Sequence, residues 1–272
     1  MHSPRLRAGF GLLLSAACLG PGSLSAPDGP PAAPLPPGHN VLFIGNSLTY
    51  VNDLPAMVAT LARAGGVTLQ VRSLTAANRA LVDFVLDGSA ASTIQQGNWE
   101  HVVMQQGPTT VPICRDTAVM AVRDIAALAR SAGAASVVMM SWPARARLGD
   151  LAKVHESAQM AAVTASAKLA PVGDAWQLAN QSDPSLDFYG PDNYHPSPLG
   201  TFLAALVIVE QVTRLDVRAL PSASLAINGL PALSSATMQL LQRSAHAANV
   251  NAFAIPVAAW APSVPPAPAI SC

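Results

Sequence analysis

Short apolar runs alternate with longer helical stretches through most of this chain, and that order restricts its fold more than any other feature. The runs predict strands near residues 41–45, 67–73, 101–105, 136–141 and 171–173. The stretches between them predict helices near 54–64, 79–96, 115–132 and 151–169. Strands that alternate with helices are typical of βαβ units and a parallel sheet. Because such crossovers are right-handed, we expect helices on both faces of the sheet.

Two further helices are expected after the last strand, near residues 198–213 and 234–248. Ser197 and Pro198 fit the N-cap and first turn of the earlier one. A chain of 272 residues has room for one α/β domain with terminal extensions. We therefore predict a single folded domain over residues 39–250.

The N-terminus has the pattern of an export signal. Arg5 and Arg7 precede an apolar run over residues 8–19, which is too short to span a bilayer as a mature helix. The small residues Ser23 and Ser25 predict cleavage before Ala26, so residues 1–25 are interpreted as a signal peptide and the protein as periplasmic or secreted. A buried N-terminal helix and a lipoprotein acylated at Cys18 are the alternatives. Ser15 stands where a lipoprotein signal usually has leucine, which disfavours the second.

Both ends of the predicted domain are rich in proline. Residues 26–38 predict a semi-rigid, polyproline-like linker, and residues 251–272 an extended Ala/Pro-rich tail. Once the signal is removed, Cys114 and Cys272 remain, and an oxidising compartment favours a disulfide between them. One buried thiol and one frayed terminal thiol is the alternative.

The overall composition excludes several classes of partner. The chain has 15 basic and 15 acidic residues and a formal net charge of zero, so it lacks the basic stripe of a nucleic-acid-binding protein. There is no glycine-rich phosphate loop and no Cys/His cluster of metal-ligand spacing. The sequence accordingly predicts no metal, no organic cofactor and no transmembrane span after signal removal.

The first predicted strand runs directly into Gly45-Asn46-Ser47-Leu48-Thr49. A buried strand that ends in glycine is followed by a sharp turn. This turn places Ser47 at the carboxyl edge of the sheet, where open α/β folds bind their ligands. A turn or helix-cap serine is the purely structural alternative.

A second polar group lies far downstream, in the proline-bounded segment Asp192-Asn193-Tyr194-His195. Serine is a weak nucleophile until a base lies within hydrogen-bonding reach, and histidine suits that role at neutral pH. The imidazole in turn needs a partner that holds its tautomer, which Asp192 can supply from the same turn. Taken singly, Asp192 could make an Asx-turn and His195 could be an ordinary loop histidine.

The two segments together resemble the SGNH (GDSL-type) hydrolase superfamily, over residues 39–212. The C-terminal portion, GPDNYHPSPLGTFLAA, is the more specific part of the resemblance. It implies a flavodoxin-like, three-layer α/β/α domain with a five-stranded parallel sheet. It also implies an ester hydrolase in which Ser47 attacks the acyl carbon, His195 carries the proton and Asp192 orients His195.

The resemblance further implies an oxyanion hole built from three donors. They are the backbone amide of Ser47, a glycine amide after the second strand and an asparagine side chain after the third strand. This chain departs from that pattern at both later positions. Asn78 is our candidate for the glycine, because asparagine tolerates left-handed backbone. Gln105, or failing that Gln106, is the candidate for the asparagine.

The sequence thus predicts an exported serine esterase whose substrate is a small-molecule or carbohydrate acyl ester, such as an O-acetylated sugar. The preference for carbohydrate follows from the breadth of the family and from export. Three alternatives stay open: a lipase or lysophospholipase, an acyltransferase that uses the same triad, and a non-catalytic glycan-binding relative.

Overall fold

A computed structural model describes residues 39–221 and 229–254, all within one compact unit. The predicted signal peptide (1–25), the linker (26–38), Cys18 and Cys272 lie outside the described residues, as does most of the predicted tail.

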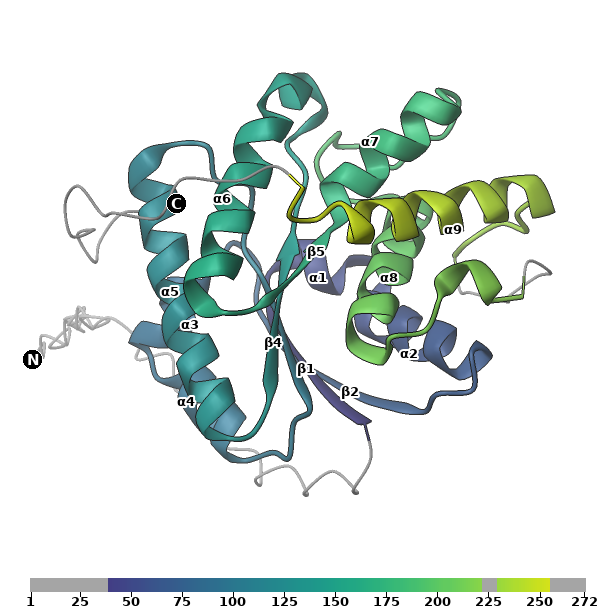
Figure 1. Cartoon of the computed structure of the whole chain (residues 1–272). Coiled ribbons are helices and arrows are strands. Elements are labelled where there is room, and N and C mark those ends of the chain that lie inside the picture. Colours follow the sequence, from purple (N-terminus) through teal and green to yellow (C-terminus); the bar gives the residue numbers. More distant parts are fainter. Residues whose placement is uncertain (1–38, 222–228, 255–272) are drawn as a thin grey trace, which may run out of the picture. The chain divides into compact units, whose positions relative to one another are not determined.

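The centre of the domain is a parallel sheet in the order β2-β1-β3-β4-β5 (Figure 1). Every pair of neighbouring strands is parallel, and the register aligns Gly45 with Thr75 and Gln105 with Met139. The predicted fold class is therefore confirmed. The strands are β1 (His39–Gly45), β2 (Leu69–Thr75), β3 (His101–Gln105), β4 (Ala135–Met140) and β5 (Lys168–Pro171).

Helices cover both faces of this sheet (Figure 1). On one face lie α3 (Leu81–Leu86), α4 (Ser89–Gln95), α5 (Pro112–Ser131) and α6 (Leu151–Ala165). On the other lie α1 (Ser47–Tyr50), α2 (Leu54–Ala64), α7 (Val172–Ser182), α8 (Pro198–Thr213) and α9 (Ser235–Val250). Three short 3₁₀ segments complete the described elements: η1 (Val51–Asp53), η2 (Arg145–Asp150) and η3 (Val217–Ala219).

The core consists of two apolar layers separated by the sheet. Along β1, Val41 and Phe43 face one layer while Leu42 and Ile44 face the other, as the two-residue period of a strand requires. All four side chains are fully buried, which explains why this strand has a continuous apolar sequence.

Helix α8 is buried over most of its surface, and this fixes the position of the loop before it. Residues 202–209 are all completely or almost completely buried, as expected for a helix that is apolar on every side. Ser197 caps this helix by accepting a hydrogen bond from the Gly200 amide at 3.1 Å, as the sequence predicts. A Cβ added at Gly200 would lie 2.2 Å from the Phe188 carbonyl oxygen, so only glycine permits this close approach.

The sequence placed several element boundaries incorrectly. The helix predicted over 151–169 ends at Ala165, and the strand predicted over 67–73 spans Leu69–Thr75. The fifth strand ends at Pro171, and the apolar residues assigned to it, from Val172 onward, form the first turn of α7. A short buried apolar run has no periodicity that separates strand from helix. The helix predicted over 79–96 is two helices, because Gly88 adopts a left-handed φ of 74° between them.

Within residues 39–221 and 229–254, no helix combines the length and the apolar character that crossing a bilayer requires.

Candidate active site

The turn after β1 sets the position of Ser47. Asn46 caps α1, because its Oδ1 accepts a hydrogen bond from the Leu48 amide at 3.1 Å, and Ser47 is the first helical residue. Gly45 is required by packing: an added Cβ would lie 2.6 Å from both Gln105 Oε1 and Thr49 Oγ1. The hydroxyl group therefore projects from a tightly held turn.

Asp192 organises the loop that carries His195. Its Oδ1 accepts hydrogen bonds from the backbone amides of Tyr194 and His195 at 3.0 and 2.9 Å. Its Oδ2 lies 2.5 Å from His195 Nδ1. The hydrogen bond to the His195 side chain, followed by those two amides, lowers the pKa of the Asp192 carboxyl to about 2. The carboxylate is thus ionised at neutral pH, and the exposure of half of its side chain to water also favours the charged form.

The histidine loop reaches the serine. His195 Nε2 lies 2.8 Å from Ser47 Oγ, which is hydrogen-bonding distance between residues 148 positions apart in the chain. Hydroxyl, imidazole and carboxylate form a continuous series of contacts, in the geometry that activates a serine nucleophile. About a third of the His195 side chain is exposed, so solvent reaches the imidazole.

Asn52 joins the nucleophile segment to the histidine loop, a role that the sequence analysis missed. Its Nδ2 donates to the Pro196 carbonyl at 3.0 Å and contacts Thr201 Oγ1 at 2.9 Å. The residue adopts a left-handed φ of 58°, which asparagine tolerates. The hydrophobic pattern carries no sign of this contact.

Arg145 and Trp142, which follow β4, hold the histidine loop from the other side. The Arg145 amide donates to the Asn193 carbonyl at 2.9 Å, and its Nε donates to Asn193 Oδ1 at 2.7 Å. Its guanidinium also pairs with Asp187 and lies over the Tyr189 ring. Trp142 Nε1 donates to the Tyr194 carbonyl at 3.0 Å. The histidine loop is therefore fixed through its backbone carbonyls.

Gln105 has surroundings that do not suit a direct oxyanion donor. Its Oε1 accepts hydrogen bonds from the Asn46 amide at 3.0 Å and Thr49 Oγ1 at 2.9 Å. The side chain is 1% exposed, and its Nε2 is buried with no partner in the described residues. Gln105 thus supports the nucleophile turn from beneath, because odd-numbered residues of β3 face the layer that contains α1.

Gln106 points to the opposite side of β3 and is only half-buried. Its Oε1 accepts a hydrogen bond from the Leu81 amide at 2.8 Å, at the end of the loop that follows β2. That contact fixes the amide group while leaving Nε2 without a hydrogen bond among the described residues. Gln106 is the more exposed of the two glutamines, and it lines a small pocket together with Gly107 and Ser141.

Asn78 lies in the loop after β2 and adopts a left-handed φ of 58°, as expected for a residue at a glycine position. Asn46 Nδ2 donates to the carbonyl of the next residue, Arg79, at 3.0 Å. The loop that carries Asn78 is therefore tied both to the serine turn and, through Leu81, to Gln106.

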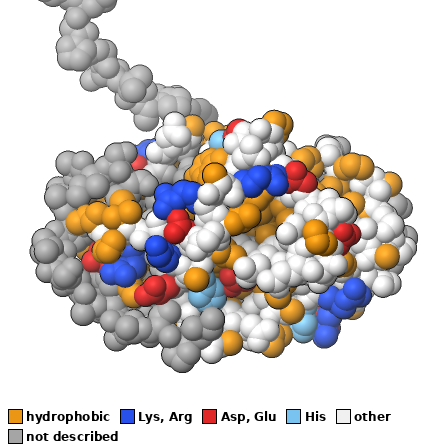
Figure 2. Space-filling view, turned by 90° about the horizontal axis from the view of Figure 1, so that it is seen from above, with side chains coloured by type: hydrophobic (Ala, Val, Ile, Leu, Met, Phe, Trp, Pro, Cys, Tyr) orange, Lys and Arg blue, Asp and Glu red, His pale blue; other side chains and the backbone are white. Residues whose placement is uncertain are grey.

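The histidine loop borders an open cleft of about 660 Å³, and Ser47 is not among the residues that line it. Its lining includes Asn52, Asp192 and His195, together with Arg145 and Tyr189. Figure 2 looks down on the domain from above Figure 1, onto the side where α1 follows the end of β1. Hydrophobic, basic and acidic side chains are interspersed on that face, so its described part carries no stripe of one charge.

One group of side chains has the composition of a metal site but lies elsewhere. Ligand atoms of Glu210, Asp216 and His246 are within 4.8 Å of one another. Asp216 already pairs with Arg218, and Glu210 with His246 and an asparagine amide. Glu210 lies about three turns along α8 from the histidine loop, so this cluster is remote from the triad.

Comparison of the sequence with protein-family models gives no match, and comparison with curated proteins gives none either. Solved structures do match. A protein from Slackia heliotrinireducens, described as a candidate SGNH hydrolase, is 27% identical with a TM-score of 0.52, over 64% of this chain and 98% of that one. A DUF4886 family protein from Bacteroides uniformis is 18% identical with a TM-score of 0.63, over 78% and 95%.

A third structure is a variant of Axe2, an acetyl-xylooligosaccharide esterase from Geobacillus. It is 14% identical with a TM-score of 0.52, over 65% of this chain and 94% of that one. These comparisons confirm the resemblance that the sequence predicts: the chain has the SGNH-type hydrolase fold. They support a hydrolase of this type.

Proposed function

We propose that this protein is a serine ester hydrolase whose catalytic residues are Ser47, His195 and Asp192. The observation that carries the proposal is the continuous contact from Ser47 Oγ through the His195 ring to the Asp192 carboxylate, at 2.8 and 2.5 Å. The SGNH-type hydrolase fold supports the same conclusion, because the serine stands at the carboxyl edge of a parallel sheet.

The reaction would proceed in two steps. Ser47 Oγ attacks the acyl carbon while His195 Nε2 takes its proton, and the imidazolium then returns that proton to the departing alcohol oxygen. An acyl group remains on Ser47. A water molecule, deprotonated by His195, next attacks this ester, and the carboxylic acid leaves as the serine regains its proton. Asp192 stabilises the imidazolium in both steps without itself being protonated.

The negative charge on the intermediate would be stabilised by the backbone amides of Ser47 and Asn78 and by the Nε2 of Gln106. The half-buried amide of Gln106, anchored at its oxygen by Leu81, supports this choice over Gln105. Donors held in place before the reaction stabilise an oxyanion most effectively. Gln105 would act indirectly, by holding the Asn46 amide and Thr49 beneath the serine.

As substrate we propose a short acyl ester, in particular an O-acetyl group on a carbohydrate. One structural neighbour, Axe2, is an acetyl-xylooligosaccharide esterase, which supports this class. We further propose that residues 1–25 direct export, that residues 26–38 link the signal to the catalytic domain, and that Cys114 pairs with Cys272 in the oxidising compartment. Lipidation of Cys18 remains the alternative mode of export.

Hydrolysis of p-nitrophenyl acetate and of acetylated xylo-oligosaccharide by the purified mature protein tests the proposal. Ser47→Ala and His195→Ala are each expected to reduce turnover to background while circular dichroism stays unchanged. Asp192→Asn should slow turnover by about 100-fold or more, because it removes the charge that stabilises the imidazolium. Turnover that survives Ser47→Ala at the wild-type rate would refute the assignment.

A further inference from the structure

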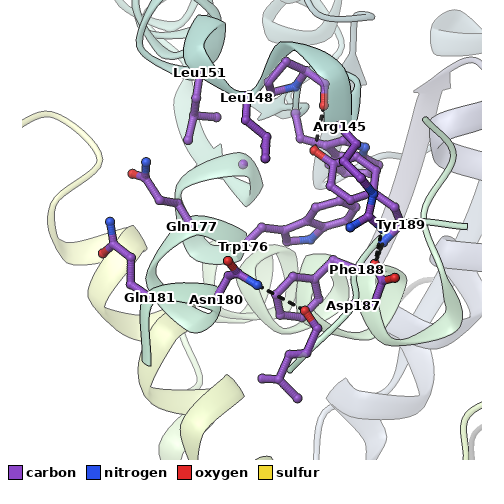
Figure 3. A pocket seen from close by; sticks show the side chains of 14 residues that line it. Arg145, Leu148, Leu151, Trp176, Gln177, Asn180, Gln181, Asp187, Phe188 and Tyr189 are labelled. Carbon is purple, nitrogen blue, oxygen red and sulfur yellow. Dashed lines mark hydrogen bonds and ion pairs between the residues drawn. The ribbon is translucent and has the colours of Figure 1, made fainter. Parts of the chain in front are cut away.

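Beside the catalytic cleft lies a second, more enclosed pocket of about 280 Å³ (Figure 3). It is formed by η2, α7 and the segment 186–189. Trp176 lies at its centre, stacked on Trp142 with ring centroids 3.9 Å apart and an interplanar angle of 19°. Leu148 and Leu151 line the side next to η2. Trp142 and Trp176 are only 1% and 4% exposed, so the apolar surface open to a ligand comes mainly from Leu148, Leu186 and Tyr189.

Helix α7 adds three amide side chains to this surface. Gln177, Asn180 and Gln181 follow Trp176 on the face of the helix that borders the pocket (Figure 3). All three are exposed, and the side chains of Gln177 and Gln181 make no hydrogen bond within residues 39–221 and 229–254. An amide both donates and accepts, so this edge can bind hydroxyl groups in either role.

The charges of the pocket are already neutralised. Arg145 and Asp187 are the charged members of its described lining, and they pair with each other. An ionic ligand would find no free countercharge among these residues. The apolar surface of Leu148 and Tyr189 beside uncharged amides suits a neutral ligand that has an apolar face and several hydroxyl groups, which is the chemistry of a sugar residue.

The pocket and the catalytic cleft share a wall. Arg145, Asp187 and Tyr189 border both cavities, and the cleft also contains His195. Arg145 is hydrogen-bonded to Asn193 in the catalytic loop. We propose that this pocket is a sugar-binding subsite, which holds one residue of an oligosaccharide while an acylated neighbour extends past Arg145 to Ser47. The inference rests on the proposed esterase function and adds the place where the carbohydrate binds.

Binding is tested without any reaction by titrating Ser47→Ala protein with unacetylated xylotetraose. Tryptophan fluorescence reports on the four tryptophans of the chain, Trp142 and Trp176 among them, and calorimetry gives the dissociation constant. When Gln177→Ala and Gln181→Ala are both introduced into the Ser47→Ala protein, xylotetraose binding should weaken by about tenfold. This is the expected effect of losing two or more hydrogen bonds. Gln95→Ala, an exposed glutamine on α4, is the matched control and should bind like the parent.

Activity gives the second readout. The Gln177→Ala/Gln181→Ala enzyme should lose about tenfold more kcat/KM on acetylated xylo-oligosaccharide than on p-nitrophenyl acetate. Equal losses on both esters, together with unchanged xylotetraose binding, would overturn the subsite and leave the esterase proposal intact. A selective loss on p-nitrophenyl octanoate instead would also overturn it, because the pocket would then bind acyl chains. If the wild-type protein is inactive on every ester, the proposed esterase function is refuted. The xylotetraose titration would then decide by itself whether the pocket binds a sugar.

Discussion

Gln105 and Gln106 are adjacent in the sequence, but their amides lie on opposite sides of β3. Gln105 is fully buried beneath the serine turn, and Gln106 borders the loop after β2. The alternation of side chains along a strand explains the difference, since a shift of one residue moves a side chain to the other face. The sequence could not distinguish the two, because either residue supplies an amide at the end of the strand.

The two glutamines should respond differently to substitution. Gln106→Leu is expected to lower kcat by about 100-fold, since removing one oxyanion donor has an effect of that size, while the melting temperature changes little. Gln105→Leu should lower the free energy of unfolding by about 2 kcal/mol, because the buried Asn46 amide loses its acceptor. Kinetics and thermal denaturation of both variants check this. A normal kcat in Gln106→Leu would remove that residue from the oxyanion hole.

The sequence predicts Ser47, Asp192 and His195 as a triad, whereas it gives no sign of the residues that hold them in place. Ser47, Asp192 and His195 occur in short local patterns with a chemical reason for each residue type. Asn52 and Arg145 act across 144 and 48 positions in the chain, and nothing near either residue in the sequence signals its contact. Such contacts depend on how the loops pack, which hydrophobic periodicity does not encode.

At the scale of elements, the contact between η1 and the histidine loop should affect catalysis. Asn52→Gly keeps the left-handed backbone available but removes the amide that binds the Pro196 carbonyl and Thr201. We expect kcat to fall by about tenfold as His195 loses its fixed position, with the secondary structure retained.

Asp53→Gly is the control for that variant, because Asp53 has a similar φ of 52° and its side chain caps α2 instead. It should reduce stability with little effect on kcat. Equal kinetic losses in the two variants would show that the Asn52 amide has no specific role.

A second histidine–carboxylate pair joins α6 to α7 around the edge strand β5. His155 Nδ1 lies 2.6 Å from Asp174 Oδ2, and this hydrogen bond, opposed by burial, raises the pKa of His155. A pKa raised on folding means that the stabilisation is complete below the unfolded value of 6.5 and is lost as the pH rises through the folded value.

The free energy of unfolding of the wild type should therefore exceed that of His155→Gln most clearly near pH 6, and the difference should shrink towards pH 9. Urea denaturation at a series of pH values measures it. A difference that is constant across this range would exclude the ion pair as its source.

The order of strands and helices was predictable, but several boundaries were not. Strands β1 to β4 and helices α2, α8 and α9 follow from apolar runs, caps and prolines. The break between α3 and α4 depends on the left-handed conformation of Gly88, which the sequence permits without requiring. The end of β5 depends on burial of α7 against α8, a tertiary effect.

At the scale of the whole domain, the fold brings Ser47 and His195 to one edge of the sheet from opposite ends of the chain. The buried helix α8 and the sheet position the two loops independently. Asn52 then joins the two loops, and Trp142 and Arg145 hold the histidine loop against the segment after β4. Ester hydrolysis by this arrangement therefore requires Ser47 to be a reactive nucleophile in the folded protein.

Reaction of the protein with a fluorophosphonate tests this claim most directly. Ser47 Oγ should attack phosphorus and displace fluoride, giving one covalent adduct that peptide mass spectrometry locates at Ser47. Ser47→Ala should give no adduct, and His195→Ala should react at least about 100-fold more slowly because the base is missing. Failure of the folded wild-type protein to react, or an adduct at a different serine, would contradict the account.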